Sequence, residues 1–166
     1  MEILIAIVII LLISIRQIQQ YERGVKFTFG KYTQTLEPGW RLILPIIQGM
    51  QKVDIRTKAV DVPDQEAITL DNISIRINAV IYYKVKDAAR AIIEVESYYY
   101  AISQLAQTTM RNIVGTVDLD SLLKNRDEIA TSIRNIVEKA SDKWGIPVEA
   151  VELKDVRLPD DLKRTM

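Results

Sequence analysis

The chain has 166 residues, which suits one compact domain of typical size or two small ones. Its 22 basic residues balance its 22 acidic residues, and this even balance argues against a nucleic-acid-binding protein, which normally carries a clear basic excess. The chain has no cysteine and no histidine, so disulfides, palmitoylated cysteines, thiolate nucleophiles, the usual zinc sites and histidine-based acid–base catalysis are all excluded.

The first predicted element is an apolar membrane anchor over residues 1–16. Residues 3–15 read ILIAIVIILLISI, with Ser14 as the one polar residue, so the segment lacks the polar face of an amphipathic surface helix. A helix of this length extends over about 20 Å, less than the roughly 30 Å of a bilayer core, which leaves open whether the anchor spans the membrane or inserts partway. The side chains predicted to contact lipid are Ile3, Leu4, Ile5, Ile7, Val8, Ile9, Ile10, Leu11, Leu12, Ile13 and Ile15.

Two other interpretations of this segment stay open, a cleaved secretory signal and a buried core element. A signal is disfavoured because Glu2 precedes the apolar run and no small-x-small cleavage motif follows it. A continuous apolar run of this length at the extreme terminus would be unusual for the core of a soluble fold. Membrane insertion is therefore the preferred interpretation.

The charges near the segment favour contact with a membrane. Residues 1–58 carry eight basic and four acidic residues, a net charge of +4, which leaves −4 for the rest of the chain. Such a bias beside an apolar segment suits an anionic membrane surface, although solvated strand residues would give the same pattern. Arg16, Arg23 and Arg41 are predicted to contact lipid headgroups. Because the basic residues follow the anchor, the domain is expected on the cytoplasmic side.

The residues after the anchor predict an antiparallel sheet. Residues 25–29 and 53–59 alternate polar and apolar side chains, and Gly30 ends the first of these runs. Pro38-Gly39 is typical of a type II turn, and Asp71-Asn72 predicts a second turn. Between residues 73 and 85 an apolar side chain occupies every second position, which predicts a long, half-buried strand in the centre of the sheet.

Helical patterns begin at residue 88. Residues 88–95 and 98–114 predict two helices, the second ending at Gly115. A third helix is predicted to begin at Asn125, with Glu128 as its capping-box partner, and to end at Gly145. Its apolar stripe consists of Ile129, Ile133, Ile136, Val137, Ala140 and Trp144.

A last strand and the start of another helix close the sequence. In residues 151–158 the alternation changes phase at Lys154-Asp155, which predicts a bulge, and Pro159 with two following acids predicts a helix start. The predicted fold class is α+β: an elongated domain with an N-terminal antiparallel sheet, packed helices and a returning C-terminal strand, preceded by the anchor. The domain is expected over residues 17–158, with lobes over about 17–86 and 87–158, and residues 159–166 are interpreted as the start of a truncated C-terminal helix.

Several short motifs, in this order and spacing, resemble the core of the stomatin family. They are YERGV at 21–25, PG at 38–39, VDIRT at 53–57, QLAQTTMR at 104–111, RDEI at 126–129, WGI at 144–146 and VELKDVRLP at 151–159. Each motif alone is weak, but the ordered series over about residues 17–166 is specific. The chain is identified as similar to a stomatin or slipin of the wider band 7 group, which includes prohibitins and flotillins.

The resemblance implies a function and a set of partners. It implies a membrane-attached homo-oligomer that organises bilayer microdomains and modulates channels or proteases, with a coiled coil continuing from Pro159. It also suggests an NfeD-type membrane protein or a membrane protease as partner. An alternative within the resemblance is a regulatory subunit that binds one such protein without forming large rings. Animal stomatins carry palmitoylated cysteines and a proline-broken hairpin; this chain has no cysteine and no proline before Pro38, which favours a simple terminal anchor.

A second apolar run follows Trp40 and Arg41. Pro45 argues against a central strand in this run. It is predicted either as a second membrane contact, with Trp40 at the interface, or as a core segment beneath the sheet. Its candidate contact residues are Trp40, Leu42, Ile43, Leu44, Ile46 and Ile47.

Other residue clusters favour structural roles. The run Tyr98-Tyr99-Tyr100 is interpreted as part of a helix–sheet core in preference to an interface patch. Asp118 with Asp120, and Asp160 with Asp161, are interpreted as helix caps. The chain has no Walker loop, no Gly-x-Ser-x-Gly and no dinucleotide fingerprint, so no catalytic residue, metal site or cofactor is predicted.

Overall fold

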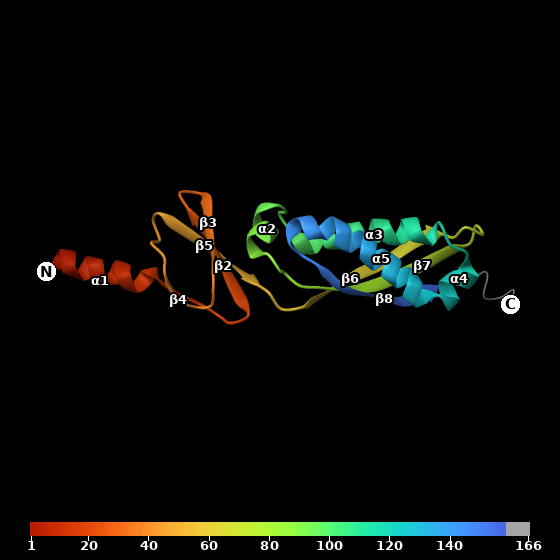
Figure 1. Cartoon of the computed structure of the whole chain (residues 1–166), viewed down its shortest axis with the longest axis horizontal. Coiled ribbons are helices and arrows are strands. Elements are labelled where there is room, and N and C mark those ends of the chain that lie inside the picture. Colours follow the sequence, from red (N-terminus) through yellow and green to blue (C-terminus); the bar gives the residue numbers. More distant parts are fainter. Residues whose placement is uncertain (159–166) are drawn as a thin grey trace.

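The structure, a computed structural model, describes residues 1–158, except for the side chains of residues 3, 4, 6–8 and 10. The helix expected from Pro159 therefore lies outside the described residues. The molecule is elongated, with α1 projecting from one end of the long axis and α4 with the end of β8 at the other (Figure 1). The elements are α1 (Glu2–Ser14), β1 (Ile15–Ile18), β2 (Glu22–Thr28), β3 (Lys31–Leu36), β4 (Gly39–Leu42), β5 (Gln48–Asp54), β6 (Lys58–Ile68), β7 (Ser74–Tyr83), α2 (Ala88–Ile93), α3 (Tyr98–Val114), α4 (Leu119–Lys124), α5 (Arg126–Ser141), η1 (Asp142–Trp144) and β8 (Val148–Arg157).

The strands form three antiparallel groups, which confirms the α+β class with antiparallel sheets. A β1–β4 ribbon and a sheet of order β3-β2-β5 make up the N-terminal lobe, residues 15–54. A sheet of order β6-β7-β8 belongs to the C-terminal lobe, residues 58–157. The chain thus passes from the N-terminal sheet to the C-terminal sheet between β5 and β6, whereas the boundary between the lobes was expected near residue 86. β6 and β7 lie with the helices because they carry the apolar face on which the helices pack.

The C-terminal lobe is built on β7. Its side chains alternate, with Ile75, Ile77 and Ile81 buried on one face, and the strand lies between β6 and β8 as predicted. The predicted turn at Asp71-Asn72 is confirmed by the positive φ of Asn72, +63°. The predicted bulge is also confirmed, because β8 uses one residue more than β7 between the pairs Ile77–Val156 and Ala79–Leu153.

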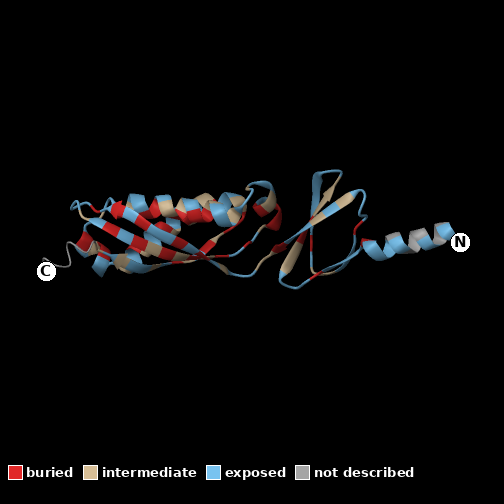
Figure 2. Cartoon of the chain, turned by 180° about the vertical axis from the view of Figure 1, so that it is seen from behind, coloured by how far each residue is buried: buried red, intermediate tan, exposed pale blue. Residues whose placement is uncertain are grey.

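Helices α3 and α5 cover one face of this sheet, α3 against β6 and α5 against β8 (Figure 1). Buried residues line the inner side of both helices, as Figure 2 shows in red. The buried residues of the stripes are Ile102, Ala106, Met110 and Val114 on α3 and Ile129, Ile133 and Val137 on α5. The helix predicted to end at Gly145 is α-helical only to Ser141; η1 continues it to Trp144, and Gly145 then ends the helical segment with a left-handed φ of +71°.

The capping box predicted at the start of α5 is wrong. Asn125 is the N-cap residue, but its side chain makes no capping hydrogen bond. The reason is that Asn125 also ends α4, where its backbone N–H donates to the carbonyl of Ser121 at 2.8 Å, and its φ of −110° and ψ of +40° lie outside the extended region that a capping side chain needs. By contrast, Asp118 caps α4 as predicted, accepting from the Ser121 N–H at 2.7 Å.

The N-terminal lobe has a small core of its own. Ile18 of β1, Leu36 of β3 and Ile43 after β4 are buried together, with Met50 of β5 packed against them. Gly24 of β2 lets the ribbon approach the sheet, because a Cβ there would lie only 2.8 Å from the Ile18 Cδ1 and the Met50 Sδ. The β1–β4 ribbon is therefore packed onto the β3-β2-β5 sheet through these four side chains.

A polar joint connects the lobes at residues 54–57. The Arg56 guanidinium donates to the Asp54 carboxylate at 2.6 Å and lies 4.2 Å from the centre of the Tyr21 ring. Hydrogen bonds from the Arg56 side chain lower the pKa of Asp54 to about 2. On the other side of the joint, Thr57 donates to Glu149 at 2.8 Å, and α2 packs against β2 and β3.

The burial difference between two isoleucines on α5 gives a stability prediction. Ile133 is fully buried and Ile136 is 49% exposed. Replacing Ile133 by Ala is expected to lower the free energy of unfolding by about 2–5 kcal/mol, because it leaves a cavity under the sheet. Ile136→Ala is the matched control on the same helix, and its effect should stay within about 0.5 kcal/mol. Urea titration followed by circular dichroism measures both, and equal losses would contradict this description of the core.

Candidate membrane-contact surface

The apolar helix α1 enters the N-terminal lobe without a loop. It ends at Ser14, and Ile15 takes an extended conformation (φ −79°, ψ 118°) as the first residue of β1. The Ser14 side chain is buried, and the Ser14 backbone carbonyl accepts a hydrogen bond from the Ile43 N–H at 2.8 Å. The base of α1 is thereby held against the loop that follows β4.

The described side chains of α1 are largely exposed. Between 49% and 66% of the surface of each large apolar one is accessible. These residues are Ile5, Ile9, Leu11, Leu12 and Ile13. An exposed Leu or Ile forgoes about 1.5–3 kcal/mol relative to full burial, so this surface is stabilised by an apolar environment. Among the helices of residues 1–158, none is both long enough and apolar enough to cross a membrane.

The β1–β4 ribbon continues the apolar surface on one of its faces. Ile15 lies opposite Leu42, and Gln17 lies opposite Trp40. Side chains of directly opposed residues share a face of an antiparallel ladder, so Ile15, Leu42 and Trp40 lie on the same side. Trp40 is 73% exposed and Leu42 55% exposed. This face is therefore an outward apolar face beside the base of α1.

Residues 42–47 were considered either as a second membrane contact or as a core segment, and the structure places different residues of the run in these two positions. Ile43 is buried in the small core, as the core interpretation requires, whereas Leu44, Ile46 and Ile47 are exposed. Ile46 is 89% exposed, at the tip of the loop. The loop is ordered by hydrogen bonds from the N–H groups of Ile47 and Gln48 to the Leu44 carbonyl, at 3.2 and 2.8 Å. The loop lies at the end of the lobe from which α1 projects (Figure 1), and three of its apolar side chains are exposed.

Phe29 joins this surface and was not predicted to do so. The alternation of residues 25–29 placed it in a strand, but Phe29 and Gly30 form the turn between β2 and β3, with φ of +50° and +78°. Its side chain is 82% exposed, and its N–H donates to the Ile47 carbonyl at 3.0 Å. The one sequence signal for this turn was Gly30, because the first position of a two-residue hairpin turn usually holds Asn, Asp or Gly and Phe29 gives no such indication.

We refer to this surface as the apolar tip. It consists of Ile5, Ile9, Leu11, Leu12 and Ile13 of α1 together with Ile15, Phe29, Trp40, Leu42, Leu44, Ile46 and Ile47. Strand pairing and loop hydrogen bonds connect the backbone segments that carry these side chains. Soluble monomers rarely expose apolar patches of this kind, and larger ones mark contacts with proteins or membranes.

Of the three predicted headgroup residues, two lie together. Arg16 and Arg41 are directly opposite each other in the β1–β4 ladder, and both are exposed. Within residues 1–158 neither has an ion-pair partner; Arg41 donates only to the Glu37 carbonyl, at 3.3 Å. Arg23 lies elsewhere, because β2 begins at the end of the ribbon away from α1. It lines a cleft with Lys86 and Asp87 between the lobes.

The remaining sequence candidates have the following positions. Tyr98 packs edge-on against the buried Tyr83, with ring centres 6.1 Å apart, whereas Tyr99 and Tyr100 are exposed. Asp120 forms a surface ion pair with Lys124 at 2.6 Å. Asp160 and Asp161 lie outside the described residues. No group of acidic side chains in the described part of the chain has the arrangement of a metal site.

Comparison with protein families resolves the relationship that the ordered motifs suggested. The model of the SPFH domain / Band 7 family matches residues 16–166. The chain therefore belongs to the SPFH/Band 7 family. The match begins at Arg16, directly after the apolar helix, and covers both lobes of this SPFH chain.

Individual relatives show that the chain is homologous to stomatins. It is 43% identical over 164 residues to a stomatin homolog of Pyrococcus horikoshii, an alignment that covers 99% of the chain and 62% of that protein. It is 41% identical over 156 residues to the stomatin of Mus musculus, covering 93% and 55% of the two chains. An uncharacterized protein of Archaeoglobus fulgidus is 45% identical over 163 residues, covering 98% and 66%. The SPFH chain thus spans less than two thirds of the length of these relatives.

The two tryptophans of the chain give a prediction for the apolar tip. Trp40 belongs to the tip, whereas Trp144 lies in the C-terminal lobe. In a Trp144→Phe variant, adding phosphatidylcholine vesicles should shift the emission of Trp40 to the blue, and brominated lipids should quench it, because the indole ring enters an apolar environment.

The matched control is Trp40→Phe, which leaves Trp144 as the probe. Its emission should be insensitive to brominated lipid. Equal quenching of both tryptophans, or of neither, would show that the apolar tip is not the part of the chain in contact with lipid.

Proposed function

We propose that this chain is the membrane-anchored part of an oligomeric scaffold, which organises the surrounding bilayer and modulates membrane proteins without catalysing a reaction. The observation that carries the proposal is the apolar tip, in which α1, the β1–β4 ribbon and two loop tips expose apolar side chains at one end of the molecule. Membership of the family that includes stomatins supports a scaffolding role.

The elongated shape supports attachment at one end. α1 and the loop after β4 lie at one end of the long axis, and the C-terminal lobe extends away from them (Figure 1). With α1 in the lipid, the C-terminal lobe extends beyond the headgroups, on the cytoplasmic side in this proposal. The exposed Arg16 and Arg41, at the base of α1, are then at the level of lipid phosphates, where each basic residue contributes about 1 kcal/mol to membrane binding.

Self-association is the second part of the proposal. The β6-β7-β8 sheet has two long outer strands, β6 with 11 residues and β8 with 10. Outer strands carry backbone groups that can pair with a second chain, although Pro63 and a register shift interrupt β6. Pairing along the C-terminal lobe would arrange neighbouring copies side by side on the same membrane, in keeping with anchors that all lie at one end.

A regulatory subunit of a single membrane protease or channel, for example with an NfeD-type partner, is the alternative. The exposed Tyr99 and Tyr100 favour it, because tyrosine is enriched in protein interfaces. The two functions differ in the particle extracted from membranes with mild detergent. A particle of many identical subunits supports the scaffold, and a small complex of fixed composition supports the regulatory subunit.

Deleting residues 1–16 tests the anchor. The full chain should sediment with phosphatidylcholine vesicles in 1 M salt, whereas the shortened chain should stay in solution, because it has lost the apolar helix while retaining only the loop contacts. In low salt, any residual binding of the shortened chain should fall further with Ile46→Asp. Leu70→Asp is the matched control, since Leu70 is 70% exposed on the β6–β7 connection. Full sedimentation of the shortened chain in 1 M salt would contradict α1 as the main attachment.

A further inference from the structure

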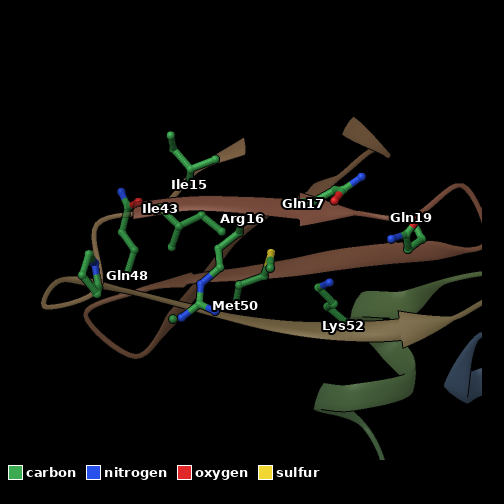
Figure 3. A pocket seen from close by; sticks show the side chains of 10 residues that line it. Ile15, Arg16, Gln17, Gln19, Ile43, Gln48, Met50 and Lys52 are labelled. Atoms are coloured by element: carbon green, nitrogen blue, oxygen red, sulfur yellow. The ribbon is translucent and has the colours of Figure 1, made fainter. Parts of the chain in front are cut away.

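A pocket lies between the β1–β4 ribbon and β5, beside the base of α1 (Figure 3). Its volume is about 620 Å³, within the usual range for sites that bind small molecules. It is bordered by the outer edge of β1 and by β5, which is an outer strand of the β3-β2-β5 sheet. Residues far apart in the sequence therefore meet here. The lining residues are Ile15, Arg16, Gln17, Gln19, Ile43, Pro45, Gln48, Gly49, Met50 and Lys52.

The charge of the pocket suits an anion. Arg16 and Lys52 are its charged lining residues, and no acidic residue lines it. Figure 3 shows the Arg16 side chain extending toward β5 and the Lys52 side chain rising from β5 on the other side of Met50. Lys52 contacts the Glu22 carboxylate at 3.2 Å, but Arg16 has no ion-pair partner within residues 1–158. A guanidinium can bind a phosphate through two parallel hydrogen bonds, and an ammonium adds a point charge.

The ribbon itself supports the same conclusion. Arg16 and Arg41 oppose each other across the β1–β4 ladder, and two like charges in this arrangement destabilise a ladder. The Arg41 side chain is turned toward the Glu37 carbonyl, which leaves Arg16 on the side of the pocket. An anion bound at Arg16 would offset the repulsion between the two guanidinium groups.

The remaining walls fit a lipid better than a free anion. Gln19 and Gln48 add amide donors, while Ile43 and Met50 give the pocket an apolar side. The pocket also opens next to Ile15, where α1 meets the lobe, and this is headgroup level if α1 is in the bilayer. We propose that this pocket binds the phosphate of one anionic lipid, with Arg16 and Lys52 on the phosphate and Ile43 and Met50 against the glycerol and upper acyl chain. The inference rests on the proposed membrane attachment.

Lipid binding to the pocket is tested by titrating the chain, held in neutral detergent micelles, with phosphatidylglycerol or phosphatidylcholine. Native mass spectrometry should detect one phosphatidylglycerol bound per chain, saturably, and much weaker binding of phosphatidylcholine. Arg16→Gln and Lys52→Gln should each weaken phosphatidylglycerol binding by about tenfold or more, as expected for loss of a charge-assisted hydrogen bond. Lys31→Gln, an exposed basic residue beside the β2–β3 turn, removes the same charge outside the pocket and should change the affinity less than about twofold.

Two results would contradict the proposal that the pocket binds an anionic lipid. One is an equal loss of affinity with Lys31→Gln, because the binding would then reflect overall charge. The other is no loss with either pocket variant. Both variants should keep the melting temperature of the original chain, since Arg16 makes no ion pair within the described residues and the Lys52 pair is at the surface. If one variant fails to fold, the other, on a different strand, still decides the question.

A second arm separates a lipid from a soluble phosphate compound. Inorganic phosphate should compete with phosphatidylglycerol only at concentrations far above that of the lipid, because it leaves the apolar wall uncovered. Competition at equal concentration would overturn the assignment to a lipid. Sedimentation of Arg16→Gln with neutral phosphatidylcholine vesicles in 1 M salt is expected to be unchanged, since α1 is intact. Failure of the pocket is thereby distinguished from failure of the anchor.

Discussion

The short ladder between β1 and β4 determines how the apolar helix is attached to the rest of the molecule. Because α1 ends at Ser14 and β1 begins at Ile15, no linker separates the helix from the ribbon. The backbone carbonyl of Ser14 also accepts a hydrogen bond from the Ile43 N–H in the loop after β4. The ribbon is held in turn by Ile18 and Ile43 in the small core with Leu36. The helix, the outward face of the ribbon and the loop are therefore presented together at one end of the N-terminal lobe.

This arrangement separates apolar from charged groups over a few residues. Within the ribbon, alternate residues face opposite sides, so Trp40 and Leu42 point outward while Arg41 lies with Arg16 on the other face. A surface with an apolar end and a basic rim matches a lipid bilayer, whose hydrocarbon interior is bordered by anionic phosphates. The alternation of strand side chains, not a dedicated motif, produces this match.

Much of the fold was predictable from the sequence because it depends on local periodicity. The alternation in residues 73–85 identified β7, the helical stripe including Ile133 identified α5, and Gly145 marked the end of η1, which follows α5 directly. The capping box at Asn125 failed because one residue serves two helices, and the backbone hydrogen bond that ends α4 sets its conformation. Phe29 was misplaced because an aromatic residue in phase with a strand gives no sign that the strand ends before it.

The candidate site was only partly predictable, for a different physical reason. Whether Ile43 or Ile46 is buried depends on what packs over each, and both are equally apolar in the sequence. The pocket forms where two sheet edges meet, so Arg16 and Lys52 become neighbours only through the packing of the ribbon onto the β3-β2-β5 sheet. Composition near the N-terminus indicated a basic bias, but not which arginine would lie beside the anchor and which between the lobes.

Spin-label accessibility measures most directly whether α1 and the loop tips beside it enter the same membrane. Because the chain has no cysteine, single cysteines can be introduced without background labelling. Nitroxide labels at positions 29 and 46, with a reference label at position 70, can be compared in the vesicle-bound 166-residue chain by their accessibility to oxygen and to a water-soluble nickel complex. We expect the labels at 29 and 46 to be accessible to oxygen and shielded from nickel, while the label at 70 remains accessible to nickel. Nickel accessibility at 29 and 46 equal to that at 70 would contradict it.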